Sequence, residues 1–146
     1  MNRNELMEIL PHRNSMLLLD EAYEEDGYAH GIYTIKGDEF FLDGHFPGFP
    51  IVPGVILCEI LAQSTAVLLK DRMQEGKVCL YAGLDKVRFK SPVLPGDRFE
   101  TKCSIVKSKG MFYFAQGEGY VDGELKIKAE FSFALADKSA LCSQKS

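Results

Sequence analysis

The chain has 146 residues, of which 46% are hydrophobic and 26% are charged, and its formal net charge is −4. This size and balance are typical of a single soluble globular domain, which we expect to cover residues 1–146. The negative charge argues against nucleic acid as a partner, and the first residues lack the charged-then-apolar layout of an export signal, so a cytoplasmic protein without membrane insertion is expected.

Three elements are predicted in the first half of the chain. A short helix is expected to begin at a cap on Asn4 and to end at Pro11, and residues 31–36 are expected to form a strand. Residues 55–69, V-I-L-C-E-I-L-A-Q-S-T-A-V-L-L, are apolar on almost every face, which is the pattern of a helix buried all round. At about 15 residues this helix is too short to span a membrane, which takes roughly 20.

After Gly76 the hydrophobic period changes to two. Residues 99–106 and 112–121 are expected to be strands joined by a turn at Lys109-Gly110, and Asp122-Gly123 is a hairpin signal before a further strand. The alternating apolar positions of that last strand are Leu125, Ile127, Ala129, Phe131, Phe133 and Leu135. These elements predict an α+β domain in which consecutive antiparallel strands surround one buried helix.

Three smaller features complete the organisation. Ala115, Gly117 and Gly119 fall on one face of the strand over residues 112–121, where small side chains would let a helix lie close. The tail over residues 136–146 is polar and is expected to be frayed. The cysteines lie far apart without a C-x-x-C pair and the histidines lack ligand spacing, so we expect reduced thiols and no metal site; the residues are Cys58, Cys79, Cys103, Cys142, His12, His30 and His45.

The segment over residues 44–63, G-H-F-P-G-F-P-I-V-P-G-V-I-L-C-E-I-L-A-Q, concentrates the chemistry. His45 stands in a proline-rich loop that leads directly into the apolar helix carrying Glu59. Gln63 follows Glu59 by four residues, so the two share a face of the helix, and a buried carboxylate needs a partner or a wet cavity. Two interpretations stay open: an acid–base pair of His45 and Glu59, or a structural Glu59–Gln63 pair.

The start of this helix offers a third group. Pro53 has no N–H to leave unpaired, and Gly54 has no side chain to block a ligand. The amides of Gly54 and Val55 would then point outward at the positive end of the helix dipole, where they could bind a carbonyl oxygen that gains negative charge. An ordinary Pro-Gly helix start is the alternative.

Three blocks of the chain resemble the (3R)-hydroxyacyl-acyl-carrier-protein dehydratases of the FabZ type, which have the hot-dog fold. The blocks are L-P-H-R at 10–13 with L-L-L-D at 17–20, the run from His45 to Gln63, and A-G-L-D-K-V-R-F-K-S-P-V-L-P-G-D at 82–97. The resemblance implies dehydration of 3-hydroxyacyl thioesters on acyl carrier protein in fatty acid biosynthesis, without a cofactor. The related FabA-type enzymes have aspartate at the position of Glu59, so glutamate favours the simple dehydratase.

The resemblance also implies roles for individual residues. His45 and Glu59 are expected to be the catalytic pair, and the Gly54 and Val55 amides to bind the thioester carbonyl. Phe46, Pro53 and Gln63 are expected to support this site. The family implies a homodimer, often assembled as a trimer of dimers, in which His45 of one chain faces Glu59 of the other.

The chain departs from the family pattern at a few positions. Ser15 and Met16 stand where Pro-Phe is usual, and Ile60 stands where a small alanine usually follows the glutamate. A branched side chain at Ile60 could narrow or redirect an acyl tunnel, so the chain-length preference does not follow from the resemblance.

One basic stripe and two further function classes stay open. Lys86, Arg88 and Lys90 alternate with apolar residues, so one strand face could be a docking surface for the acidic carrier protein; an ordinary solvated face is the alternative. A hot-dog acyl thioesterase would use the same helix start to activate water, and a non-catalytic acyl-binding protein would retain the tunnel without turnover.

Overall fold

The structure, a computed structural model, describes residues 1–10, 16–42, 50–72, 77–137 and 139 of the chain. Its helices are α1 (Arg3–Ile9), η2 (Phe40–Leu42), α2 (Gly54–Thr65) and η3 (Ala66–Leu69). Its strands are β1 (Glu21–Glu25), β2 (Tyr28–Thr34), β3 (Lys77–Phe89), β4 (Arg98–Lys109), β5 (Phe112–Val121) and β6 (Glu124–Asp137). Among the described residues, no helix has the length and apolar character that crossing a membrane requires.

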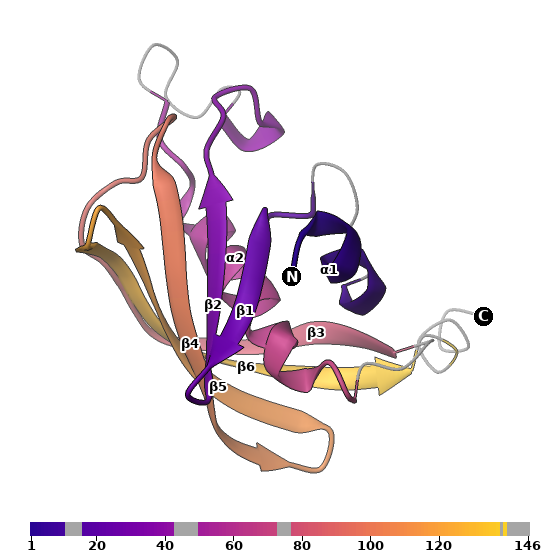
Figure 1. Ribbon diagram of the computed structural model, residues 1–146. Coiled ribbons are helices and arrows are strands. Elements are labelled where there is room, and N and C mark those ends of the chain that lie inside the picture. Colours follow the sequence, from indigo (N-terminus) through magenta and orange to yellow (C-terminus); the bar gives the residue numbers. More distant parts are fainter. Residues whose placement is uncertain (11–15, 43–49, 73–76, 138, 140–146) are drawn as a thin grey trace.

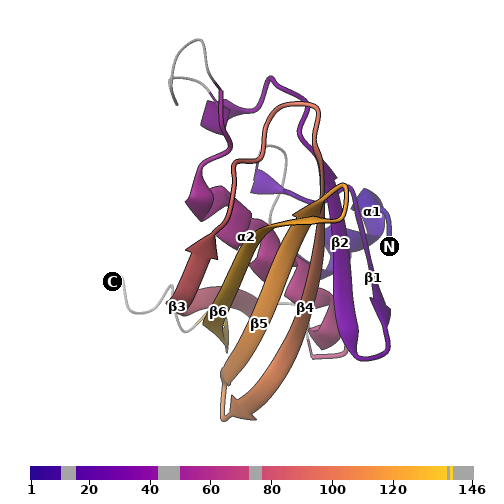
Figure 2. The same ribbon diagram turned by 90° about the vertical axis from the view of Figure 1, so that its left-hand side faces the viewer.

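The strands form one antiparallel sheet in the order β1-β2-β4-β5-β6-β3. The sheet curves strongly, and α2 lies against one of its faces (Figures 1 and 2). The predicted α+β architecture, with antiparallel strands around a buried helix, is therefore confirmed. Because β3 pairs only with β6 and β1 only with β2, these two strands form the edges of the sheet.

Helix α2 has apolar and polar side chains in the interior. Leu57, Ile60 and Leu61 are at most 3% exposed, but so are Gln63, Ser64 and Thr65. The predicted single helix over residues 55–69 is α-helical only to Thr65 and continues as the tighter η3. Ser64 and Thr65 donate their hydroxyls to the carbonyls of Ile60 and Leu61 at 2.8 Å, a bonding pattern that bends helices and accompanies this change.

The beginning of the chain differs from the prediction at two places. Helix α1 is capped by Asn2 instead of Asn4: Asn2 Oδ1 accepts from the Glu5 amide at 2.9 Å and Glu5 Oε1 accepts from the Asn2 amide at 3.2 Å. Strand β1 was not predicted, and β2 begins at Tyr28 instead of Gly31. The hairpin between them turns at Asp26 and Gly27, whose φ angles of 54° and 81° match the Asp-Gly turn signal.

The second half agrees closely with the prediction. Strand β5 has the predicted bounds, β4 is longer than expected at both ends, and Asp122 and Gly123 form the expected turn with φ angles of 51° and 77°. Strand β6 buries alternate residues as predicted. It continues through Ala136 and Asp137, which pair with Val78 and Lys77, so these two residues belong to the sheet and not to the expected frayed tail.

The small residues of β5 serve two purposes. A Cβ on Gly117 would lie 2.8 Å from Cys103 Sγ of β4 and 3.3 Å from Leu61 Cδ2 of α2, so this glycine makes room for both the neighbouring strand and, as predicted, the helix. A Cβ on Gly119 would instead lie 2.2 Å from the Phe99 ring, so this position makes room for an aromatic side chain of β4 and not for the helix.

A glycine on β2 lets the last turn of α2 lie close to the sheet. The Gly31 amide donates to Thr101 Oγ1 at 2.9 Å, and the Thr101 hydroxyl donates to Ser64 Oγ at 2.7 Å. A Cβ on Gly31 would lie 2.3 Å from Ser64 Oγ and 2.7 Å from Thr101 Oγ1. Any side chain here would break this buried polar chain between sheet and helix.

We therefore expect Gly31→Ala to lower the free energy of unfolding by about 1–3 kcal/mol, the usual scale for overpacking a filled interior. Gly83→Ala on β3 is the matched control, because its Cβ would meet only Ser132 Oγ at 3.2 Å; a change within about 0.5 kcal/mol is expected there. Urea unfolding measures both. Equal losses would show that the close approach at Gly31 carries no special cost.

Candidate active site

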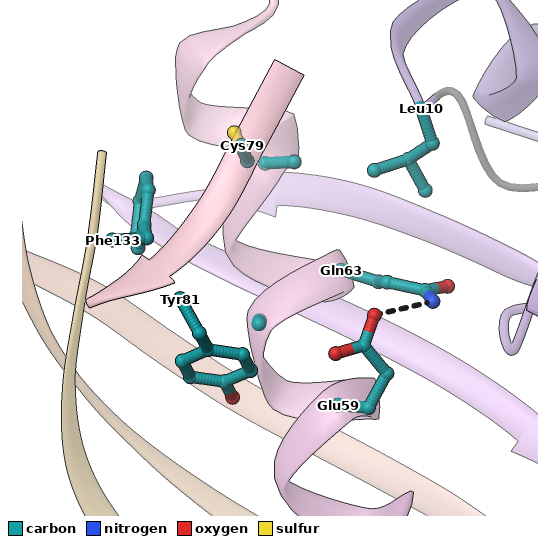
Figure 3. A pocket seen from close by; sticks show the side chains of 8 residues that line it. Leu10, Glu59, Gln63, Cys79, Tyr81 and Phe133 are labelled. Atoms are coloured by element: carbon teal, nitrogen blue, oxygen red, sulfur yellow. Dashed lines mark hydrogen bonds between the residues drawn. The ribbon is translucent and has the colours of Figure 1, made fainter. Parts of the chain in front are cut away.

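Glu59 lies on α2 at the wall of a small cavity of about 30 Å³. Figure 3 shows its side chain beside that of Gln63, with Tyr81 and Cys79 of β3 across from the helix. The cavity is lined by Leu10, Glu59, Ala62, Gln63, Ala66, Cys79, Tyr81 and Phe133. By the measure in which a water molecule needs about 10–15 Å³, this space holds a water or two and no acyl chain.

The amide of Gln63 makes hydrogen bonds in three directions. Its Oε1 accepts from the Leu18 amide at 2.9 Å, while its Nε2 donates to the Met16 carbonyl at 2.9 Å and to Glu59 Oε1 at 3.0 Å. Because Leu18 N can only donate and Met16 O can only accept, these neighbours determine which end of the amide is oxygen. Gln63 is therefore a donor to Glu59.

This geometry confirms the Glu59–Gln63 hydrogen bond that was one of the two interpretations of the pair. It does not exclude chemistry at Glu59. Since Glu59 Oε1 accepts a hydrogen bond from Gln63 Nε2, Oε2 is the oxygen placed to carry any proton of the carboxyl group. Figure 3 shows this second oxygen directed to the side on which Tyr81 lies.

Tyr81 and the nearby thiols are held in their neutral forms. Although 38% of Tyr81 is exposed at the edge of the sheet, burial of its hydroxyl against α2 raises its pKa far above the ordinary value, and the negative charges that Cys58 and Glu59 can carry raise it further. The Tyr81 hydroxyl donates to the carbonyl of Cys58. Burial also raises the pKa of Cys79 to about 11 and that of Cys58 above its usual range, so neither is a nucleophilic thiolate at neutral pH.

Helix α2 begins as the sequence predicted, with Pro53 at its N-cap. The Ile56 and Leu57 amides donate to the Pro53 carbonyl at 3.0 and 3.3 Å, and in the described part of the chain no acceptor is recorded for the amides of Gly54 and Val55. The reason for a glycine differs from the expected one. A Cβ on Gly54 would lie 2.6 Å from Phe89 Cζ, so the space beside Gly54 is occupied by the Phe89 ring.

The other predicted site residues are placed as follows. His45 and Phe46 lie outside the described residues. Ile60 is 0% exposed and does not line the cavity; Glu59, Ala62 and Gln63 of α2 and Ala66 of η3 do. The tunnel role of Ile60 stays a prediction. Core packing accounts for its position in the described structure.

The predicted basic stripe lies on an irregular part of β3. The register of β3 against β6 shifts between Asp85 and Arg88, and Lys86 has a φ of 48°, so simple alternation does not place the three residues on one face. Lys86 lies 3.5 Å from Glu130, Arg88 pairs with Lys128, and Lys90 follows the end of the strand. All three are exposed, and their docking role stays a prediction.

Tyr81 and Phe89 were missed as site residues. Both come from β3, and the separation of 89 − 81 = 8 residues is even, so a period of two would have put them on the same face. This even spacing can be read from the sequence. The contacts of Tyr81 and Phe89 with α2 cannot be read from it, because they depend on the positions of two register shifts within β3.

Comparison with known proteins places the chain among acyl-thioester enzymes. Residues 10–130 match the FabA-like domain family. The chain is 40% identical over 137 residues to the 3-hydroxyacyl-acyl-carrier-protein dehydratase FabZ of Staphylococcus epidermidis, covering 92% of this chain and 94% of the relative. It is 41% identical over 140 residues to the enzyme of the same name from Clostridium beijerinckii, covering 92% and 99% of the two chains.

Solved structures share the fold with lower sequence identity. A chain of the dehydratase heterocomplex ApeI:P from Xenorhabdus doucetiae has a TM-score of 0.80 at 21% identity, with 95% of both chains covered. A thioesterase superfamily member from Thermus thermophilus has a TM-score of 0.67 at 16% identity, covering 86% of this chain and 90% of that one. These neighbours confirm the expected hot-dog fold, which dehydratases and thioesterases have in common.

The orientation of Gln63 gives a test that separates charge from shape. In Gln63→Glu, a carboxylate would replace the donor that faces the Met16 carbonyl and Glu59, so the new group must hold a proton in the folded protein. Its pKa is then raised by folding. The variant should be most stable, relative to wild type, below about pH 4.3, the unfolded value for glutamate, and should lose stability as the pH rises above it.

Gln63→Met is the matched control, because it has similar size and cannot titrate. It should be destabilised by about 1–3 kcal/mol or more through the polar groups left unpaired. Its loss of stability with rising pH should be smaller than that of Gln63→Glu, because only the donor to Glu59 is lost and no second carboxyl group is added. Thermal melts of the three proteins between about pH 4 and 8 measure this. Parallel pH dependence of Gln63→Glu and wild type would contradict the assigned orientation.

Proposed function

The chain belongs to the FabA-like family, and we propose that it dehydrates (3R)-3-hydroxyacyl thioesters on acyl carrier protein to trans-2-enoyl thioesters in fatty acid biosynthesis. The observation that carries this proposal is Glu59 on the wall of a small cavity, five residues after a helix start whose Gly54 and Val55 amides have no acceptor among the described residues. The chain is 40% identical to a dehydratase over most of its length. The reaction would take place in the cytoplasm, where the acyl carrier protein is the partner.

The mechanism removes a proton from C2 and the hydroxyl group from C3. Binding of the thioester carbonyl by the Gly54 and Val55 amides would stabilise the negative charge that develops when the C2 proton leaves. His45 takes that proton, and Glu59 gives a proton from Oε2 to the C3 hydroxyl, which departs as water. Glu59 follows Gly54 by 59 − 54 = 5 residues, about 7.5 Å along the helix axis, so both groups can reach one short substrate segment.

A second division of labour uses the same residues. His45 could move both protons while Glu59 orients the departing water. In either scheme Gln63 holds the carboxyl group of Glu59 in place, and no cofactor takes part. Pro53 and Phe46 complete the support of the site, Pro53 by starting α2 where the carbonyl binds.

Two properties of the sheet support a homodimer. Edge strand β1 is only 5 residues long and carries Glu21, Glu24 and Glu25, which protect it from pairing. Edge strand β3 is 13 residues long and exposes Leu80 and Leu84 by 41% and 48%. A long, apolar edge of this kind is a pairing surface, and we place the second copy of the chain there.

A partner at β3 also completes the site. Cys79 and Tyr81 of β3 form part of the wall around Glu59, so a second chain at that edge lies next to the cavity. The cavity of one chain is too small for an acyl substrate. A composite site, in which His45 of one chain faces Glu59 of the other, supplies the missing wall and the base. Three such dimers would form the hexamer of the family.

The docking surface for the carrier protein is expected at the end of β3. Lys86, Arg88 and Lys90 are cations at the end of β3, and an acidic carrier protein would be steered to them. Phe89 lies between this region and the start of α2. Acyl thioesterase activity is the second candidate function. Its support is the fold, which a thioesterase superfamily member shares.

One assay distinguishes the two activities and tests the catalytic pair. Wild-type protein supplied with hydroxyacyl carrier-protein substrates should change the ultraviolet absorbance by forming an enoyl thioester, without release of free thiol. Glu59→Gln and His45→Ala should each lower kcat by about 10²-fold or more, the usual contribution of acid–base groups. Glu124→Gln and His30→Ala are the controls, because Glu124 is exposed, His30 stacks on Tyr23, and neither lines the cavity. Both variants should keep the wild-type kcat. Thiol release as the main product would favour the thioesterase.

The cross-subunit arrangement is tested by mixing inactive variants. After equal amounts of His45→Ala and Glu59→Ala are unfolded and refolded together, about half of the dimers should contain both chains if pairing is random. Each mixed dimer then has one intact site, so activity should recover to about a quarter of wild type. With mixed dimers confirmed by mass spectrometry, recovery close to zero would place both residues on one chain.

A further inference from the structure

Tyr81 joins edge strand β3 to the turn of α2 that carries Glu59. Its hydroxyl donates to the main-chain carbonyl of Cys58, the residue directly before Glu59. Its ring contacts Phe131 edge-on, with ring centroids 6.0 Å apart and an interplanar angle of 63°. The same side chain lines the cavity with Glu59 (Figure 3). Tyr81 thus contacts both the backbone beside Glu59 and the space in front of it.

An irregularity in β3 sets the direction of this side chain. Tyr81 pairs with Phe133, but the next pair is Gly83 with Ser132, so Ala82 is an extra residue on β3. Paired residues of an antiparallel sheet lie on the same face, and Phe133 is buried on the face toward α2. A β-bulge of this kind often stands next to a functional site and directs a side chain toward it.

The two sides of Glu59 are therefore held separately. Gln63 donates to its carboxylate from the C-terminal side, and Tyr81 donates to the backbone from the strand. We propose that Tyr81 is a positioning residue that fixes the helix turn carrying Glu59, and with it the place from which Glu59 acts on the C3 hydroxyl; this rests on the proposed dehydratase function. A displacement of about 0.5 Å is enough to weaken an acid–base group.

The hydroxyl can serve this purpose at every working pH. Burial, the largest cause, and the neighbouring acidic groups raise the pKa of Tyr81 well above its ordinary value, so it remains a donor. The hydrogen bond is consequently a constant feature of the site. Loss of the hydroxyl should lower the rate equally across the pH range and leave the midpoints of the pH–rate profile unchanged.

The test compares two variants that each lose one hydrogen-bonded hydroxyl. Tyr81→Phe retains the ring and the cavity wall. Tyr113→Phe loses a hydroxyl that accepts from Arg72 Nη1 at 2.8 Å, away from Glu59. Tyr81→Phe should lower kcat about 3- to 10-fold with KM within about two-fold of wild type, as expected for one lost hydrogen bond felt in the transition state. Tyr113→Phe should keep the wild-type kcat.

Three results would overturn the proposal. An unchanged kcat in Tyr81→Phe would show that the hydroxyl does not position Glu59. Equal losses of kcat in Tyr81→Phe and Tyr113→Phe would show a general effect on stability. A higher KM at constant kcat would make Tyr81 a substrate contact. Melting temperatures measured alongside separate these cases from unfolding.

A second readout keeps this proposal separate from the proposed function. If the wild-type protein turns over no hydroxyacyl thioester, the dehydratase function fails, and amide hydrogen exchange decides the role of Tyr81. The amides of residues 59–63 should exchange faster in Tyr81→Phe than in wild type and in Tyr113→Phe. Equal exchange in all three proteins would overturn the positioning role whatever the activity.

Discussion

The buried amide of Gln63 is the interaction on which the candidate site depends. At 2% exposure it cannot turn to water, so its oxygen and its two N–H groups need partners within the protein. The partners come from the segment around Met16 to Leu18 and from Glu59. That segment is held in turn by Arg3 of α1, whose Nη1 donates to the carbonyls of Leu17 and Leu19 at 3.2 and 3.0 Å. The orientation of one carboxylate is therefore linked, through Gln63, to the N-terminal helix.

The next two residues of α2 are also buried polar groups with partners inside the protein. Ser64 and Thr65 are fully buried, and each hydroxyl bonds to a carbonyl one turn earlier, while Ser64 also accepts from Thr101 of the sheet. An apolar helix could rotate or slide against a smooth apolar sheet at little cost. Polar groups that each need one partner remove this freedom, because a rotation that breaks them leaves a buried group unsatisfied. The polar residues of α2 thus determine its rotation and depth, and the apolar ones supply the driving force for burial.

The sequence predicted those parts of the fold that depend on short-range patterns. The period of two in β6, the Asp122-Gly123 turn and the apolar run of α2 are local signals, and the Glu59–Gln63 contact follows from helical spacing alone. The missed parts depend on distant residues or on competition between near-equal choices. Asn2 and Asn4 are both good caps, and only Asn2 has Glu5 three residues later. Strand β1 has few apolar residues and forms by pairing with β2. The bond from Tyr81 to Cys58 spans 23 residues and needs the bulge at Ala82, which no local pattern indicates.

The cavity lies at the edge of the sheet that β3 forms. Glu59 faces Tyr81 and Cys79, which belong to the edge strand β3. The cavity therefore lies where a second chain could reach it. The opposite edge is short and acidic, so the two edges are unequal in their ability to pair. In the proposed dimer, pairing at β3 would cover apolar side chains and enlarge a water-sized cavity into an acyl site in the same step. Assembly and formation of the active site would then be one event, and an isolated chain would have the acid without the space for its substrate.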